Sequence, residues 1–289
     1  DAETVRAEAL EARFVLLGEK HDNPAHHRGQ AEILQALVDA GRRPTVVWEM
    51  IDHEQMAPSV FDGTVDEFGA RVAWEQSGWP PYAIYRPIAS VAINAGLMQA
   101  PGNLPPAAMR TAYREGLAGL DSSRARGLGV RVTLSGESLT SLQAEIKRGH
   151  CGYGDDTMLA SMAAAQQTRD AFMASQLRER ASDDGAVLIA GNGHVRRDRG
   201  VPYHLLDASG ASSRAEPNAR ASEQVLVIGW LEVNDEKVAP DDYVRAGNRA
   251  FDIIFFTDRV SDEDPCDRFD EQIEQIRAQE AKRKERDAM

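Results

Sequence analysis

Histidine and glutamate side chains follow apolar segments at three places in the sequence. Phe14 to Leu17 are apolar and lead into Gly18-Glu-Lys-His21, and a second apolar run leads into Gly191-Asn-Gly-His194. A third run, Val-Val-Trp, ends in Glu49. Histidine exchanges protons near neutral pH and is the commonest metal ligand, and glutamate can serve as a general base. The spacing therefore indicates acid–base or metal chemistry.

The elements that must position these residues are buried strands. An apolar run that ends in glycine and precedes a helix-like pattern is typical of a strand, a tight loop and a helix start. In α/β proteins such strand ends carry the functional sites. If the first two strands are neighbours in a parallel sheet, Glu19, His21 and Glu49 emerge at one edge.

Two site chemistries and one structural role fit this arrangement. His21, Glu49 and His194 could bind a divalent metal ion. A metal-dependent hydrolase would use a catalytic set consisting of Glu19, His21, Glu49, His194 and Arg196. The structural alternative is a buried hydrogen-bond network in which Glu49 pairs with Arg196 or Arg86.

The order of strand-like and helix-like segments predicts an α/β fold. We expect a mostly parallel central sheet flanked by helices, with an inserted helical subdomain. Residues 1–60 and 181–260 are assigned to the α/β core. Helical patterns dominate residues 61–180, including a long helix from Asp156 to Arg180, and this range is assigned to the insertion. Residues 261–289 are expected to be a charged C-terminal tail.

Bulk composition excludes some classes of protein. The chain has 289 residues, of which 42% are apolar, so it can bury a substantial core. Its formal charge is -13, which argues against nucleic acid as a partner because phosphate binding needs clustered basic residues. The sequence contains two cysteines, Cys151 and Cys266. One disulfide or two free thiols are both compatible with that count.

Other histidines and tyrosines are weaker candidates for a site. His150 and Tyr153 lie in a glycine-containing loop before the long helix. Histidine and tyrosine can both ligate haem iron, so Tyr85 is a candidate as well. His26 and His27 fall in the first turn of a helix, where we expect exposed side chains.

The motifs taken together resemble the ChaN-like family of haem-binding uptake proteins. The resemblance runs in order from about Phe14 to Leu206. It rests on these motifs: Leu-Leu-Gly-Glu-Lys-His-Asp-Asn-Pro-x-His-His, Val-Val-Trp-Glu-Met, Gln166 with Arg169-Asp170 and Met173-Ala174, and Ala-Gly-Asn-Gly-His-Val-Arg-x-Asp-x-Gly-Val-Pro.

This resemblance implies a haem-binding protein of the bacterial cell envelope with a role in haem or iron uptake or handling. It implies a homodimer that holds haem between subunits. It also implies an exported lipoprotein, periplasmic or outer-membrane-associated, with a lipid anchor upstream of Asp1. Tyrosine is the iron ligand that the resemblance suggests, and Tyr153 and Tyr85 are the candidates, followed by His150.

Part of the same pattern also resembles the wider superfamily of TraB/Tiki metalloproteases and erythromycin esterase-type hydrolases. The matching residues are Gly18 to His21, Glu49 and Gly191 to His194. In that superfamily the histidines and glutamates form the active site, so a metal-dependent hydrolase is the alternative to haem binding. Location separates the two hypotheses, because a haem site should involve the helical subdomain and a hydrolase needs only the core strand ends.

Overall fold

The computed structural model describes residues 2–116, 133–207, 224–233, 239–243, 250–264, 266–267 and 269. The strands are β1 (Phe14–Glu19), β2 (Thr45–Asp52), β3 (Ser59–Val60), β4 (Met98–Asn103), β5 (Ala186–Gly191), β6 (Val225–Glu232) and β7 (Ile253–Thr257). The α-helices are α1 (Ala2–Glu11), α2 (Pro24–Asp39), α3 (Val65–Arg71), α4 (Tyr82–Asn94), α5 (Pro106–Glu115), α7 (Gly136–Gly149), α8 (Asp156–Arg180), α9 (Asn192–Val195) and α10 (Val201–Asp207), with 3-10 turns at Trp74–Gln76 and Pro240–Tyr243.

Within these residues the strands form one sheet of seven, in the order β3-β4-β2-β5-β1-β6-β7. Every neighbouring pair is parallel except β3 with β4. The register sets Glu19 of β1 beside Gly191 of β5, and β5 lies between β1 and β2. The mostly parallel α/β fold is thereby confirmed, and three strand ends that carry polar residues meet at one edge.

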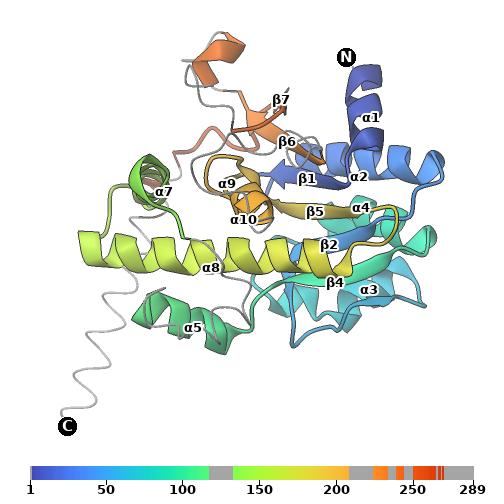
Figure 1. The fold of residues 1–289 in the computed structure, drawn as a ribbon, viewed down its shortest axis with the longest axis horizontal. Helices are drawn as coiled ribbons and strands as arrows, with labels where there is room; N and C mark the ends of the chain where they lie inside the picture. Colours follow the sequence, from blue (N-terminus) through green and yellow to red (C-terminus); the bar gives the residue numbers. More distant parts are fainter. Residues whose placement is uncertain are drawn as a thin grey trace.

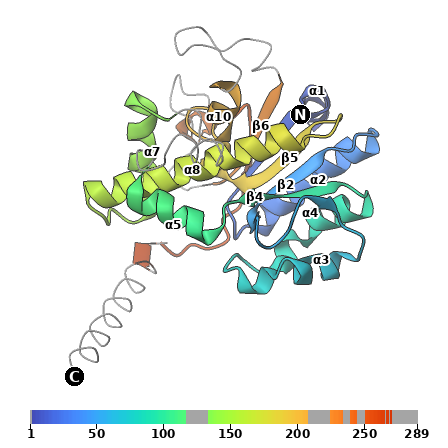
Figure 2. The same cartoon turned by 60° about the horizontal axis from the view of Figure 1, so that its bottom comes forward.

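The sheet is covered on both faces. Alternate residues of β1 point in opposite directions: Val15 and Leu17 pack in the core layer with α1, α2 and α4, and Leu16 packs in the layer with α8 and α10. Figures 1 and 2 show α2 and α4 on one side of the sheet and α8 crossing the other. Strands buried on both faces read as continuous apolar runs, which is why these segments were recognisable.

Local sequence fixes where the two helices nearest the site begin. Asn23 caps α2 by accepting a hydrogen bond from the Ala25 backbone N–H at 2.9 Å, and Pro24 occupies the first helical position. Asp155 caps α8 by accepting from the Met158 N–H at 2.8 Å. The predicted helix from Asp156 to Arg180 is confirmed as α8, which carries its middle residues beneath the strand ends.

Residues 61–180 were expected to form a helical insertion subdomain, but the structure differs. Part of this range contributes to the sheet and its core, and the rest forms helices beside the sheet. β4 is paired with β2 and β3, and α3 and α4 belong to the main core. β4 enters the sheet because four consecutive residues, Gln99 to Gly102, are buried. By contrast, α5, α7 and the first half of α8 extend away from the sheet (Figure 1). A small cluster of their own links α7 and α8, and it contains Leu142, Ile146 and Leu159.

The two cysteines form a disulfide. Cys151 and Cys266 are bonded, with their Cα atoms 5.5 Å apart and a sequence separation of 115. The predicted tail at 261–289 lies mostly outside the described residues, and Cys266 is in its described part. Among the helices that the structure describes, none is long and apolar enough to cross a membrane.

We expect Gly185→Ala to destabilise the protein more than Gly41→Ala. Both glycines have φ +86°, so both substitutions strain the backbone, at a cost of roughly 1–2 kcal/mol. A Cβ on Gly185 would also collide with the backbone carbonyl oxygen of Arg13, whereas a Cβ on Gly41 meets open space. Urea unfolding should show an additional loss of about 1–3 kcal/mol for Gly185→Ala. Equal losses would contradict this packing of β1 against β5.

Candidate functional site

Glu19, at the end of β1, is a fully buried carboxylate held by three side chains. The Nδ1–H of His21 and the hydroxyl of Tyr85 both donate to its Oε1, each at 2.8 Å. His27 Nε2 lies 3.0 Å from Oε2, without the alignment of a hydrogen bond. Burial alone would raise the pKa of Glu19, but the contacts with His21 and His27 outweigh it and lower the pKa to about 2. Glu19 is therefore anionic.

His26 and His27 are both fully buried, so the expectation that they are exposed was wrong. The first turn of α2 faces the end of β1 and not solvent. The ring of His27 packs on Tyr85, with 4.0 Å between centroids. His26 Nδ1 accepts from the Lys20 N–H, and its Nε2–H donates to Thr257, both at 2.8 Å. Burial lowers the pKa of His26 to about 4, so this neutral ring ties α2 to β7.

Glu49, at the end of β2, is the second buried carboxylate. Arg169 Nη2 donates to its Oε1 at 2.5 Å, and the backbone N–H of Gly191 donates to its Oε2 at 2.7 Å. His194 Nε2 lies 3.2 Å from Oε1. Burial would raise the pKa of Glu49, but the charges of His194 and Arg169 hold it well below its usual range. Glu49 is thus a fixed anion at the centre of the strand ends.

His194 lies between two carboxylates. Its Nδ1–H donates to Asp170 Oδ1 at 2.5 Å, while Nε2 faces Glu49. Burial opposes the charged imidazole, but Glu49 and Asp170 together raise the pKa of His194 to about 9. Burial also raises the pKa of Asp170. With both ring nitrogens directed at carboxylate oxygens, His194 is an imidazolium at neutral pH.

His21 connects the two clusters. While Nδ1 binds Glu19, Nε2 lies 3.9 Å from Glu49 Oε2. A Cβ at Gly191 would come within 2.9 Å of His21 Nε2, so glycine at 191 keeps this space open. Burial lowers the pKa of His21, but Glu49 and Glu19 reverse that effect and raise it. The joined set is called the carboxylate–histidine network and consists of Glu19, His21, His27, Glu49, Tyr85, Arg169, Asp170 and His194.

A cavity of about 380 Å³ borders the network. Its lining consists of Ser77, Gly78, Trp79, Asn103, Met109 and Arg169. The His21 ring meets Trp79 edge-on at 4.8 Å between centroids, and the His21 side chain is 32% exposed. His21 is thus a partly exposed imidazole backed by a carboxylate, and such a group can exchange protons with a bound molecule.

The network does not fit the predicted divalent metal site at His21, Glu49 and His194. Among the residues described, no group of three or more histidine, cysteine, aspartate or glutamate side chains is arranged to hold a metal ion. Charge explains this outcome. The guanidinium of Arg169 pairs with Glu49 Oε1, and His194 Nε2 lies 3.2 Å from the same oxygen, so protein cations already occupy this carboxylate.

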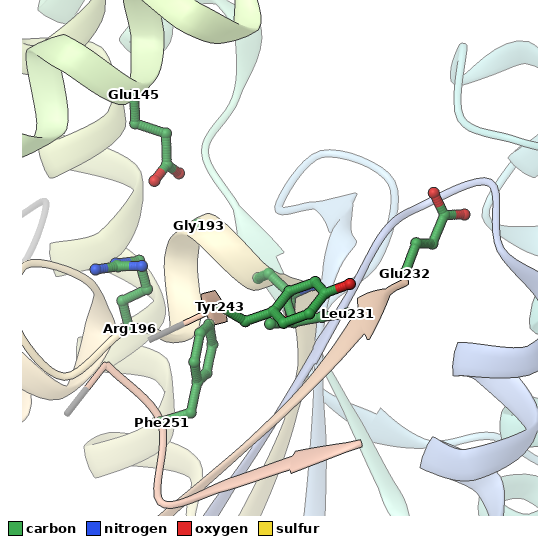
Figure 3. A pocket seen from close by; sticks show the side chains of 8 residues that line it. Glu145, Gly193, Arg196, Leu231, Glu232, Tyr243 and Phe251 are labelled. Atoms are coloured by element: carbon green, nitrogen blue, oxygen red, sulfur yellow. The ribbon is translucent and has the colours of Figure 1, made fainter. Parts of the chain in front are cut away.

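Arg196 is not part of the network, although it was expected in a catalytic set. Its guanidinium donates two hydrogen bonds to Asp198, each 2.9 Å, and lies 5.8 Å from the Phe251 ring centroid. It faces a different hollow of about 390 Å³, shown in Figure 3. Arg86 pairs with Asp66 at the surface. The expected pairing of Glu49 with Arg196 or Arg86 was therefore wrong, and Arg169 takes that role.

The three candidate haem ligands occupy two different places. Tyr85 is fully buried and its hydroxyl is committed to Glu19, so it is not presented to a surface ligand, contrary to expectation. His150 and Tyr153 lie together in the turn between α7 and α8, and Tyr153 is 40% exposed. His150 Nδ1–H donates to the Ile146 carbonyl at 2.7 Å, which leaves Nε2 with the lone pair in the neutral ring. This turn has the donor chemistry that haem iron accepts.

Sequence reasoning left His27, Arg169 and Asp170 without a role in the site. Arg169 and Asp170 lie in the most buried part of α8, among small and apolar residues. A charged pair at that place in a helix is a usable signal, because charge is seldom buried without a partner. His27 carries no comparable signal, since only the fold shows that the first turn of α2 faces Glu19.

The raised pKa of His194 predicts a pH-dependent stability. The pKa of about 9 in the folded protein exceeds the ordinary value of 6.5. The protonated His194 ring therefore contributes its full stabilisation of the fold below pH 6.5, and this stabilisation is lost as pH rises through 9. NMR titration of the His194 ring should show a midpoint near 9, and Asp170→Asn should lower it. A midpoint near 6.5 in the unmodified chain would contradict the imidazolium assignment.

Comparisons with known proteins agree with this architecture. A family model described as "Haem-binding uptake, Tiki superfamily, ChaN" matches residues 5–205. A solved structure of ChaN from Campylobacter jejuni, described as showing cofacial haem binding, has a TM-score of 0.59 and 19% identity, covering 82% of this chain and 87% of that one. A structure of the type III effector HopBA1 has a TM-score of 0.42 and 13% identity, covering 89% and 92%. No curated protein matches.

Since the family match spans more than half of the chain, this protein belongs to the ChaN family of haem-binding uptake proteins, within the Tiki superfamily.

Proposed function

We propose that this protein binds haem at the turn between α7 and α8 and serves haem or iron uptake or handling at the bacterial cell envelope. Family membership supplies the ligand class. The observation that carries the location is the pair His150 and Tyr153, two iron-ligating residue types on one accessible turn. That turn belongs to the helical part of the fold and is separate from the carboxylate–histidine network.

The residues fit the group. Tyrosine and histidine are both known axial ligands of haem iron. Tyr153 is the proposed ligand because its side chain is exposed, and His150 stands beside it, with Nε2 oriented by the Nδ1–H bond to Ile146. When bound, haem would supply the iron, and these side chains would hold and orient it.

The proposal extends to assembly and location. The Campylobacter structure is described by its cofacial haem binding, which supports two chains sharing the ligand here. A disulfide persists in oxidising compartments, so the bond between Cys151 and Cys266 supports a periplasmic or outer-membrane-associated protein. A lipid anchor upstream of Asp1 belongs to the same proposal.

Haem titration of two tyrosine variants tests the ligand. Tyr153→Phe removes the phenol oxygen from the proposed site, so we expect the haem affinity to fall at least tenfold and the Soret band to shift. A tenfold fall corresponds to a loss of about 1.4 kcal/mol of binding free energy. Tyr113→Phe is the matched control, because Tyr113 is also 40% exposed but lies on α5. Equal affinity of the two variants would contradict the assignment of Tyr153.

We propose acid–base hydrolysis at the carboxylate–histidine network as a second candidate function. The specific observation is that His21, held by Glu19 and close to Glu49, is partly exposed and packs on Trp79, which lines a cavity together with Arg169. His21 would exchange the proton, and Glu19 and Glu49 would hold the ring and its charge. The imidazolium of His194 would keep Glu49 in place.

A screen of small ester and amide substrates tests this second candidate. His21→Ala should lower any activity by roughly 100-fold or more, the usual effect of removing a general base. His53→Ala is the control, since His53 is an exposed histidine outside the network. His194→Ala would leave Glu49 and Asp170 without their shared partner, and unfolding should reveal a loss of about 3–5 kcal/mol. Activity that survives His21→Ala would remove the hydrolase proposal and leave the network a structural role.

A further inference from the structure

The chain beyond β7 returns to the turn that carries the proposed haem ligands. In Figure 1 the described C-terminal stretch leaves β7 and runs toward the end of the molecule where α7 lies. There Cys266 is bonded to Cys151, which lies directly after His150 and two residues before Tyr153 in that turn. Residues 266 to 269 lie outside the range 5–205 that the family model matches. This attachment is therefore additional to the part of the chain that identifies the family.

An aromatic ring from this segment packs on both candidate ligands. The Phe269 ring centroid is 5.9 Å from that of His150, at an interplanar angle of 88°. It is 6.3 Å from that of Tyr153, at 61°. Edge-to-face contacts at these distances are favourable. Phe269 is half-buried, so the residue is neither enclosed in a core nor fully exposed.

Backbone hydrogen bonds link the residues of the turn. The Tyr153 N–H donates to the His150 carbonyl at 2.8 Å, and the Gly152 N–H donates to the Lys147 carbonyl at 2.8 Å. Cys151 has φ +54°, a left-handed conformation that is unfavourable for a residue with a Cβ. Surrounding structure must maintain such a residue, and the disulfide from Cys151 is one of the restraints that do so.

We propose that Cys266 and Phe269, together called the C-terminal strap, form one wall of the haem site. Phe269 contacts the porphyrin, and the disulfide holds it in place. This inference rests on the proposed haem-binding function. Cofactor sites are lined mainly by apolar and aromatic side chains around a few polar groups. The turn supplies the polar donors at His150 and Tyr153, and Phe269 supplies an aromatic surface next to both.

Haem titration of the full chain tests the strap through affinity and the Soret spectrum. Phe269→Ala should weaken haem binding about tenfold, the factor expected when one aromatic contact of this kind is lost. It should leave the Soret position of the bound form unchanged, because the iron ligand remains. The paired substitution Cys151→Ser/Cys266→Ser should weaken binding at least as much. Phe256→Ala is the control, since it removes a partly exposed phenylalanine from β7.

The outcomes separate the strap from the haem function itself. If Tyr153→Phe weakens binding but Phe269→Ala and the paired cysteine variant bind as the unmodified chain does, the strap is not part of the site and the haem proposal stands. If the unmodified chain binds no haem, or binds it with an affinity that neither Tyr153→Phe nor Phe269→Ala alters, both proposals are overturned. Phe269→Ala removes the aromatic contact but retains the disulfide. Circular dichroism of each variant shows whether the protein is still folded, so a loss of haem contact can be distinguished from a loss of folding.

Discussion

Two ionised carboxylates, Glu19 and Glu49, are buried at the carboxyl ends of β1 and β2, on either side of β5. The rest of the structure depends on how their charges are neutralised. Removing a carboxylate from water costs several kcal/mol unless opposite charges and hydrogen bonds replace the lost solvation. The partners of Glu19 come from the β1 loop, α2 and α4, and those of Glu49 from α8, β5 and α9. Correct assembly of almost every layer is thus a condition for burying these two side chains.

The same interactions divide the protein into two places with different physical character. The carboxylate–histidine network is mostly buried and its charges are paired, with His21 and Arg169 as two of its partly exposed members. The turn with His150 and Tyr153 is accessible, and a disulfide at Cys151 anchors it. The sequence motifs that resemble the family contribute mainly to the network, whereas the proposed haem donors lie on the turn. The family motifs therefore indicate first which residues hold the fold together. The case for haem binding rests instead on the exposed turn that carries the proposed iron ligands.

Much of the fold could be predicted because buried parallel strands leave continuous apolar runs. Residues 14–17, 45–48 and 186–190 are such runs, and each is a central strand of the sheet. The long helix was equally evident from its uninterrupted pattern. β4 was harder to recognise within a helical region, because it contains Pro101 and Gly102, which weaken a strand signal. Strand order and the covering of each face follow from long-range packing, which short sequence patterns do not encode.

The site could be predicted in part for the same reason. Glycine followed by polar residues at a strand end identified Glu19, His21 and His194, and a carboxylate directly after an apolar run identified Glu49. Their partners could not be chosen, because several arginines were compatible with Glu49 and only the path of α8 selects Arg169. Tyr85 was assigned to haem by residue type, although burial against Glu19 gives it a different role. The pairing of Cys151 with Cys266 depends on the return of the chain across 115 residues, which spacing alone leaves open.

The most direct test of this account is a crystal structure of the full chain with haem. The account predicts iron bonded to the Tyr153 oxygen at the turn between α7 and α8, with Glu19 and Glu49 still paired with their histidines. Haem lodged against Trp79 and Arg169, with the carboxylate–histidine network opened to receive it, would contradict the separation of the two sites.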